Sequence, residues 1–139
     1  MALTESTTVQ VRFNDCDPLG IVWHGNYVQY FEDGREAFGE KYGLRYLDIA
    51  ARGYTVPLVN IQCDYKRPLK YGDKVVVHTT YVDDLAAKLK FEYKLTNAAT
   101  GEVVATGSSV QVFLDKESGL LQLTLPPFFS EWKKEQGLV

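Results

Sequence analysis

The order of apolar and polar side chains predicts one long helix near the N-terminus. From Tyr27 to about Tyr42 apolar side chains recur every three or four residues, which gathers them on one side of a helix. Charged residues mostly fill the opposite side. The run 24–26 suits the beginning of this helix, and Gly43 stands where a glycine commonly ends one. A shorter helix is predicted over 47–52.

Most of the remaining chain is predicted to form strands, and apolar and polar residues alternate in some of them, as in strands with one buried face. The clearest alternation runs from Lys88 to Leu95, and Pro57 is expected at a strand edge or bulge. One long helix followed by antiparallel strands predicts an α+β domain in which the helix lies across a curved sheet. Strands are predicted over 8–13, 55–65, 74–82, 88–95 and 102–114, with an extension over 120–125 and a terminal helix over 128–136.

Composition narrows the class of protein. The 139 residues contain no linker or repeat and are interpreted as one domain, 1–139. A net charge of -3 gives no electrostatic footprint for nucleic acid, and no apolar run approaches the ~20 residues of a membrane span. The N-terminal residues lack the features of a signal peptide, and two cysteines do not make a disulfide framework. A cytoplasmic protein with reduced thiols is therefore expected.

Candidate chemistry is concentrated just before the long helix. Asp15 and Asp17 stand in a dense cluster of turn residues, and the helix begins within a few residues. The free N–H groups at a helix start stabilise a developing oxyanion, and a carboxylate held beside them can attack a carbonyl or deprotonate water. The alternative is that both aspartates only shape the turn. The two histidines, His24 and His78, lack metal-ligand spacing, so no metal is expected.

The same segment resembles a known family. The run Asp15-Cys16-Asp17-Pro18-Leu19-Gly20-Ile21-Val22-Trp23 is similar to the signature of hotdog-fold thioesterases of the 4-hydroxybenzoyl-CoA thioesterase type. Residues 23–35 resemble the related acyl-CoA thioesterase branch associated with the Tol-Pal gene cluster, and 65–73 resemble that family's loop between early strands. The resemblance extends from about residue 9 to 112 and implies the hotdog fold, a long helix wrapped by an antiparallel sheet.

By this resemblance the chain is a thioesterase that hydrolyses acyl-CoA to free acid and CoA. Asp17 would be the nucleophile or the general base, and a backbone N–H near His24 and Gly25 would form the oxyanion hole. Gly25, which has no side chain, would let the thioester approach closely. Trp23 and Tyr27 complete the candidate substrate-binding residues. Coenzyme A is part of the substrate, so no separate cofactor is expected.

Three of these assignments have structural alternatives. His24 either contacts the acyl or leaving group or simply bonds to backbone at the helix start. Tyr27 belongs to an aromatic stripe that either lines an acyl pocket or packs in the core. Lys88 and Lys90 project from the polar face of a strand, where they would either bind the phosphates of coenzyme A or form a solvated surface.

The family also assembles as dimers and commonly tetramers, with active sites between subunits. This agrees with the residues themselves, because a sheet of this size cannot bury both faces within one short chain. The alternatives for the function are a 4-hydroxybenzoyl-CoA or acyl-carrier-protein thioesterase, or a non-catalytic acyl-CoA-binding module. A hotdog hydratase, which needs an Asp/His pair in its own motif, is disfavoured by the apolar link between Asp17 and His24.

Overall fold

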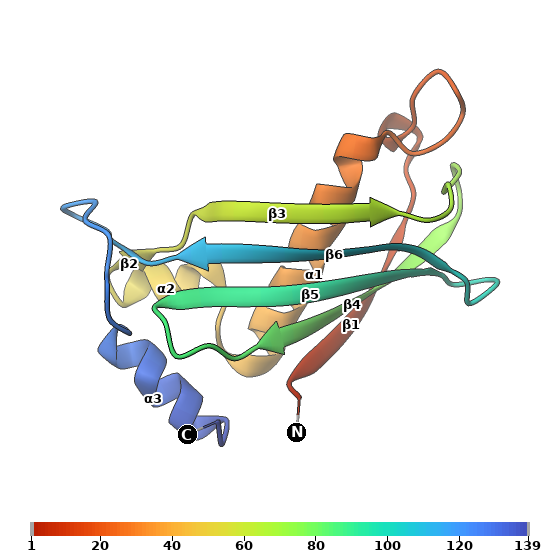
Figure 1. Cartoon of the computed structure of the whole chain (residues 1–139). Coiled ribbons are helices and arrows are strands. Elements are labelled where there is room, and N and C mark those ends of the chain that lie inside the picture. The colour runs from red at the N-terminus through yellow and green to blue at the C-terminus, as the bar shows by residue number, and fades with distance from the viewer. Residues whose placement is uncertain (1, 139) are drawn as a thin grey trace.

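The computed structural model describes residues 2–138, in which one long helix, α1 (Tyr27–Tyr42), lies across one face of an antiparallel sheet (Figure 1). The strand order of this sheet is β1, β4, β5, β6, β3. The five strands are β1 (Thr4–Gln10), β3 (Leu58–Tyr65), β4 (Lys74–Val82), β5 (Lys88–Asn97) and β6 (Val103–Val112). The predicted α+β fold of the hotdog type is confirmed.

Smaller elements surround this unit. A separate two-stranded sheet pairs β2 (Tyr54–Thr55) with β7 (Leu114–Asp115). Helices α2 (Tyr46–Ala51) and α3 (Pro127–Glu135) lie near the end of the sheet where β5 begins (Figure 1). Two short 3-10 helices, η1 (Phe13–Asp15) and η2 (His24–Asn26), connect β1 to α1. None of the helices in residues 2–138 is long and apolar enough to cross a membrane.

The core forms between the apolar side of α1 and the inner face of the sheet. Phe31 stacks on Tyr93 of β5 with ring centroids 4.4 Å apart, and Phe38 meets Phe91 edge-on at 5.0 Å. Alternate residues of β4 and β5 are buried, which the alternation from Lys88 to Leu95 predicted for β5. Helix α1 has the predicted bounds, and Gly43 ends it in the left-handed conformation with a φ of 72°.

Several predicted strands differ from the observed ones. The strand predicted over 102–114 is divided into β6, which ends at Val112, and β7 of the other sheet. The first strand ends at Gln10, three residues early, because the backbone N–H of Arg12 bonds to the Asp15 carboxylate and starts the turn η1. Pro57 divides the strand predicted over 55–65 into β2 and β3, which belong to different sheets. The extension predicted over 120–125 reduces to one bridge between Leu114 and Leu121.

Strand β3 leaves one edge of the sheet open. It pairs only with β6, and its exposed residues include Leu58, Val59 and Tyr65. At the other edge, β1 exposes only polar side chains, at Thr4, Ser6, Thr8 and Gln10. Exposed apolar residues on an unpaired strand are typical of an edge that another chain covers.

Gly34 determines how closely α1 approaches β4. A methyl group at this position would overlap Oγ1 of Thr79 and approach Cγ1 of Val77 to 2.8 Å. We expect Gly34→Ala to lower the free energy of unfolding by about 1–3 kcal/mol through overpacking, although alanine favours helices more than glycine does. Urea denaturation measures this, with Glu40→Ala on the exposed side of α1 as control. A stabilised Gly34→Ala protein would contradict the close packing.

Candidate active site

Asp17 lies in a tight turn between η1 and η2. Its N–H donates to the Ile21 carbonyl and its carbonyl accepts from the Gly20 N–H, both at 2.9 Å. The Leu19 N–H donates to Oδ1 of Asp17 at 2.9 Å, which makes an Asx turn, and Gly20 has the left-handed φ of 81° that closes it. Among the described residues Oδ2 has no partner. The turn therefore uses one carboxylate oxygen of the half-buried Asp17 and leaves the other available.

A groove of about 410 Å³ passes beside this carboxylate. One wall is the Asp17 turn and the first residues of the helical segment. The opposite wall is the end of β3 and the residues that follow it. The lining side chains are Asp17, Leu19, Ile21, Val22, His24, Tyr27, Tyr65, Lys66, Arg67 and Pro68. The structure thus brings Asp17, His24 and Tyr27 together at one groove.

The helical segment begins one turn before α1, at His24. The Asn26 side chain makes no cap bond; the first turn is the 3-10 helix η2, which continues into α1. The N–H groups of His24 and Gly25 have no acceptor among residues 2–138, while the Asn26 N–H donates to the Trp23 carbonyl at 2.9 Å. The hydroxyl of Tyr65 donates to the His24 carbonyl at 2.7 Å and ties this turn to the end of β3.

Gly25 leaves room for the neighbouring ring of Trp23. A side chain at this position would overlap the indole ring of Trp23. This contact is one reason for a glycine here, and the close approach of a thioester to Gly25 stays a prediction. Trp23 itself is 49% exposed, with its ring centroid 5.0 Å from that of His24. Trp23 and Gly25 adjoin the groove and are not among its lining side chains.

Tyr27 belongs both to the core and to the groove. Its side chain is only 3% exposed, and burial raises the pKa of its hydroxyl to about 12. The ring packs edge-on against that of Tyr65, with centroids 4.9 Å apart. The two interpretations offered for Tyr27 thus coincide, because one side of a core residue forms a wall of the groove.

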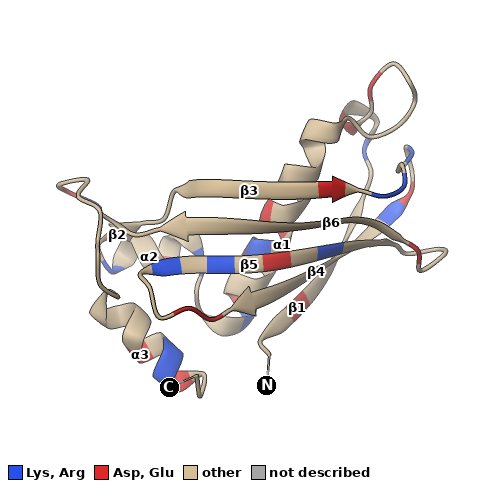
Figure 2. Cartoon of the chain, viewed as in Figure 1, with Lys and Arg blue, Asp and Glu red and all other residues tan. Residues whose placement is uncertain are grey.

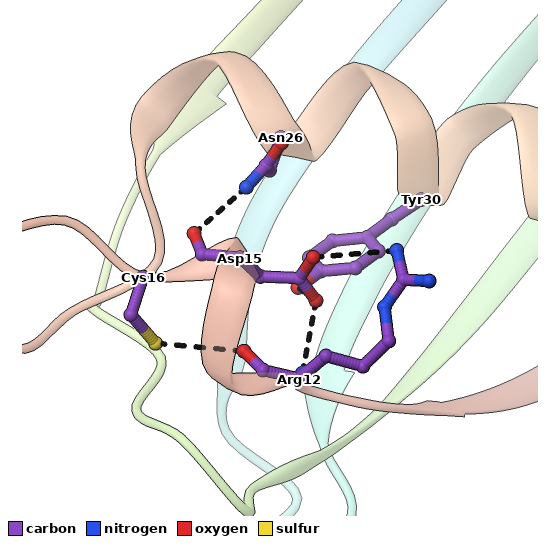
Figure 3. A network of polar contacts seen from close by, with 5 residues as sticks. All are labelled: Arg12, Asp15, Cys16, Asn26 and Tyr30. Atoms are coloured by element: carbon purple, nitrogen blue, oxygen red, sulfur yellow. Dashed lines mark hydrogen bonds and ion pairs between the residues drawn. The ribbon is translucent and has the colours of Figure 1, made fainter.

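Asp15, two residues before Asp17, is buried in a polar network (Figure 3). Its Oδ2 accepts from the Arg12 backbone N–H at 2.9 Å and from the Tyr30 hydroxyl at 3.1 Å. Its Oδ1 lies 3.3 Å from Nη2 of Arg12. Burial, followed by the Asp15 charge, raises the pKa of Tyr30, so this hydroxyl stays a donor. The carboxylate of Asp15 therefore fastens the loop to α1.

The main-chain carbonyl of Asp15 makes a second set of contacts. It accepts from Nδ2 of Asn26 at 2.7 Å and from the Trp23 N–H at 2.9 Å. The loop that carries Asp17 and the turn that carries the N–H groups of His24 and Gly25 thus share one acceptor. This network was not predicted, since Asp15 and Asn26 were interpreted as a turn residue and a cap.

Lys88 and Lys90 lie far from the groove within one chain. Both are on the outer face of β5, opposite residues 110–112 of β6, whereas the groove lies beyond Tyr65, which pairs with Ala105. Figure 2 shows these basic positions at the start of β5, at the other end of the sheet from the turn before α1. Lys90 also pairs with Asp84, with Nζ and Oδ2 3.1 Å apart.

Sequence reasoning assigned no role to three side chains of the groove, Tyr65, Lys66 and Arg67. Residues 65–73 were noted only because they resemble a loop of the known family. The polar run directly after an apolar strand was the signal that could have pointed to these side chains. Within residues 2–138, no three His, Cys, Asp or Glu side chains are grouped as a metal site requires.

The chain matches known proteins along most of its length. Residues 11–133 match the family model of the thioesterase-like superfamily. The chain is 38% identical over 110 residues to YneP of Bacillus subtilis (strain 168), whose name assigns it to the acyl-CoA thioesterases; the match covers 79% of each protein. It is 26% identical over 109 residues to the acyl-acyl carrier protein thioesterase ATL3 of Arabidopsis thaliana, covering 78% of this chain and 57% of ATL3.

A solved structure agrees with these relatives. The DHNA-CoA thioesterase from Staphylococcus aureus superimposes with a TM-score of 0.85 at 25% identity, over 97% of this chain and 92% of that one. The family model and the relatives therefore define a thioester hydrolase. The chain belongs to the thioesterase-like superfamily.

Loss of charge should lower the free energy of unfolding at Asp15 and leave it nearly unchanged at Asp17. Asp15→Asn removes an acceptor from a buried network, so we expect the free energy of unfolding to fall by about 2–3 kcal/mol. Asp17→Asn keeps the Asx turn, since an asparagine oxygen accepts the same bond, and we expect a change within about 0.5 kcal/mol. Urea denaturation of both variants tests this, and equal destabilisation would contradict the division of roles.

Proposed function

We propose that this protein hydrolyses acyl-CoA thioesters to the free acid and coenzyme A, with Asp17 as the catalytic carboxylate. One observation carries the proposal: the free oxygen of Asp17 and the first turn of the α1 segment line the same groove. The relationship to YneP supports acyl-CoA as the substrate class.

The chemistry follows from what each group offers. With the thioester carbonyl carbon near Oδ2 of Asp17, the carboxylate attacks it directly or removes a proton from a water that attacks. The carbonyl oxygen gains negative charge, which the N–H groups of His24 and Gly25 receive. The C–S bond then breaks, and coenzyme A leaves as a thiolate that takes up a proton. Direct attack leaves an acyl anhydride on Asp17, which water hydrolyses to restore the carboxylate.

Two cationic side chains line the groove and suit an anionic substrate. Lys66 and Arg67 both line it, and Arg67 is held by Glu102, with Nε and Oε2 3.0 Å apart. Phosphates of coenzyme A would interact favourably with these charges. His24, exposed beside them, would contact the leaving group.

A second copy of the chain would complete the site. Strand β3 is an open edge with exposed apolar residues, and pairing two β3 strands about a two-fold axis covers both edges at once. Identical strands related in this way run antiparallel, so the Tyr65 end of one lies beside the Leu58 end of the other. The end of the partner sheet that carries Lys88 and Lys90 then approaches the groove. This arrangement is a dimer, and a tetramer would pair two of them.

Two other substrates of the same chemistry remain as alternatives. ATL3 is named for acyl-carrier-protein substrates, and 4-hydroxybenzoyl-CoA is suggested by the turn motif. Free-thiol release from a panel of acyl-CoAs, acetyl through palmitoyl with benzoyl and 4-hydroxybenzoyl, separates them. Binding of these esters with no release from any would favour the non-catalytic acyl-CoA-binding module or an acyl-carrier-protein substrate.

Replacing the catalytic carboxylate gives the direct test. We expect Asp17→Asn to lower kcat on the preferred acyl-CoA by at least about 10³-fold, because the nucleophile or base is lost. Binding of the substrate should change little, since the fold and the groove remain. Thiol release and calorimetric binding measure the two effects. An Asp17→Asn protein with full turnover would overturn the assignment of Asp17.

Neutralising the distant lysines tests the placement of coenzyme A. We expect Lys88→Gln with Lys90→Gln to raise KM for acyl-CoA several-fold, with little change in kcat, because phosphate contacts act on binding. Lys74→Gln, at the other end of the polar face, serves as the matched control. If KM is the same in all three proteins, these lysines form only a solvated surface.

A further inference from the structure

Tyr65, the last residue of β3, connects the sheet to the first turn of the α1 segment. Its hydroxyl donates to the His24 carbonyl at 2.7 Å, and its ring lines the groove beside Asp17. The proposed reaction uses the Asp17 carboxylate and the free N–H groups of His24 and Gly25, and it gives no role to Tyr65. The position of the hydroxyl, directly on the turn that carries those N–H groups, indicates one.

The backbone around Tyr65 is anchored to β6, although β3 is an edge strand. Tyr65 pairs with Ala105, and the next two backbone N–H groups, of Lys66 and Arg67, both donate to the Val104 carbonyl. These two hydrogen bonds measure 2.9 and 3.1 Å. The chain therefore leaves β3 in a fixed direction, and the Tyr65 side chain extends from a fixed point.

The ring of Tyr65 is restrained as well. It packs edge-on against Tyr27, with ring centroids 4.9 Å apart, and Tyr27 belongs to the buried core. It also meets the His24 ring edge-on, with centroids 6.4 Å apart. A phenol keeps its proton in neutral solution, so the hydroxyl acts as a donor there. Tyr65 therefore presents one donor, at a defined position, to the His24 carbonyl.

The bond to the His24 carbonyl affects the neighbouring N–H group. This carbonyl and the Gly25 N–H belong to one planar peptide group, so fixing the oxygen also fixes the direction of the N–H. That N–H has no acceptor among residues 2–138. Hydrogen bonds in a chain also polarise one another, so a donor on the carbonyl makes the N–H of the same peptide group a stronger donor.

We infer that Tyr65 is a positioning residue of the reaction. Through the His24 carbonyl it orients and strengthens the Gly25 N–H, which receives the negative charge of the thioester oxygen. This inference rests on the proposed thioesterase function and adds a residue to the same site. The charge on that oxygen is greater in the transition state than in the bound ester, so Tyr65 acts on turnover more than on binding.

Removing the hydroxyl while keeping the ring tests this role on the intact protein. We expect Tyr65→Phe to lower kcat on the preferred acyl-CoA about five- to thirty-fold, because one hydrogen bond is lost and Asp17 stays in place. KM should change less than about two-fold, since the ring still lines the groove. Tyr71→Phe, the same change on an exposed tyrosine outside the groove, should keep both constants. A higher KM at unchanged kcat, or no effect on either constant, would overturn the inference.

The carbonyl of a bound ligand gives a second readout, one that needs no turnover. The probe is the uncleavable ketone analogue of hexanoyl-CoA, or of the preferred ester, in which CH₂ replaces the sulfur and the carbonyl carbon is ¹³C. Infrared difference spectroscopy records its carbonyl stretch, which moves to lower frequency as hydrogen bonds to the oxygen strengthen. The wild type and Tyr71→Phe should lower this frequency more than Tyr65→Phe does, with similar calorimetric affinity in all three.

The two readouts separate this inference from the proposed function. Hydrolysis with the same kcat and the same carbonyl frequency in Tyr65→Phe as in the wild type overturns the role of Tyr65 and leaves the thioesterase intact. A smaller frequency change in Tyr65→Phe supports the effect of Tyr65 on a bound carbonyl. If no ester is cleaved by the wild type, that same result overturns the proposed reaction alone.

Discussion

The site depends on the hydrogen bonds that converge on Asp15. Its carboxylate bonds to the backbone of Arg12 and to the hydroxyl of Tyr30, and its carbonyl receives donors from Trp23 and Asn26. A short loop holds the Asp17 carboxylate in one position only with such restraint, because loop geometry alone leaves that position undetermined. Here the restraint comes from α1, which the core holds against the sheet.

The positions of Asp15 and of the first helical turn depend in turn on the packing of the core. Tyr30 precedes Phe31, which stacks on Tyr93, so the same turn of α1 that packs on the sheet also holds Asp15. On the other side, the hydroxyl of Tyr65 fixes the first turn of the helical segment to β3. The N–H groups of His24 and Gly25 are left free at a point where the surrounding main chain is fixed on both sides. Preorganised donors of this kind stabilise developing charge without rearrangement.

The sequence predicted features that depend on residues close together along the chain. The bounds of α1 follow from side-chain spacing and from Gly43, both of which act within a few residues. Asp17, His24 and Tyr27 were named as candidates because residues 15–35 resemble a known family, and the structure places all three at one groove. The roles of Asp15 and Asn26 were missed because their partners are set by the path of the loop, which no spacing rule describes. The contact between Gly25 and the Trp23 ring was missed for the same reason, since the orientation of that ring depends on the path of the loop.

Contacts between distant strands could not be predicted from the sequence. Pro57 was expected to mark an edge or bulge, but the division of β2 and β3 between two sheets depends on β7, nearly sixty residues further on. The buried Oε1 of Gln111, which has no partner among the described residues, also depends on distant contacts. Its Nε2 donates to the Val56 carbonyl only once β6 is in place. Strand alternation predicts that Gln111 faces inward, against the usual preference for apolar residues.

The two ends of the edge strand β3 border different hollows. The Asp17 groove lies at the Tyr65 end of β3, and a cavity between α1, α2 and the sheet lies at the Leu58 end. These two ends are about 23 Å apart along the strand. A two-fold pairing of β3, as proposed above, would bring the unlike ends of two strands side by side. It would also cover the apolar residues that this edge exposes, so the same contact that stabilises such an assembly would set a second chain beside each Asp17 turn.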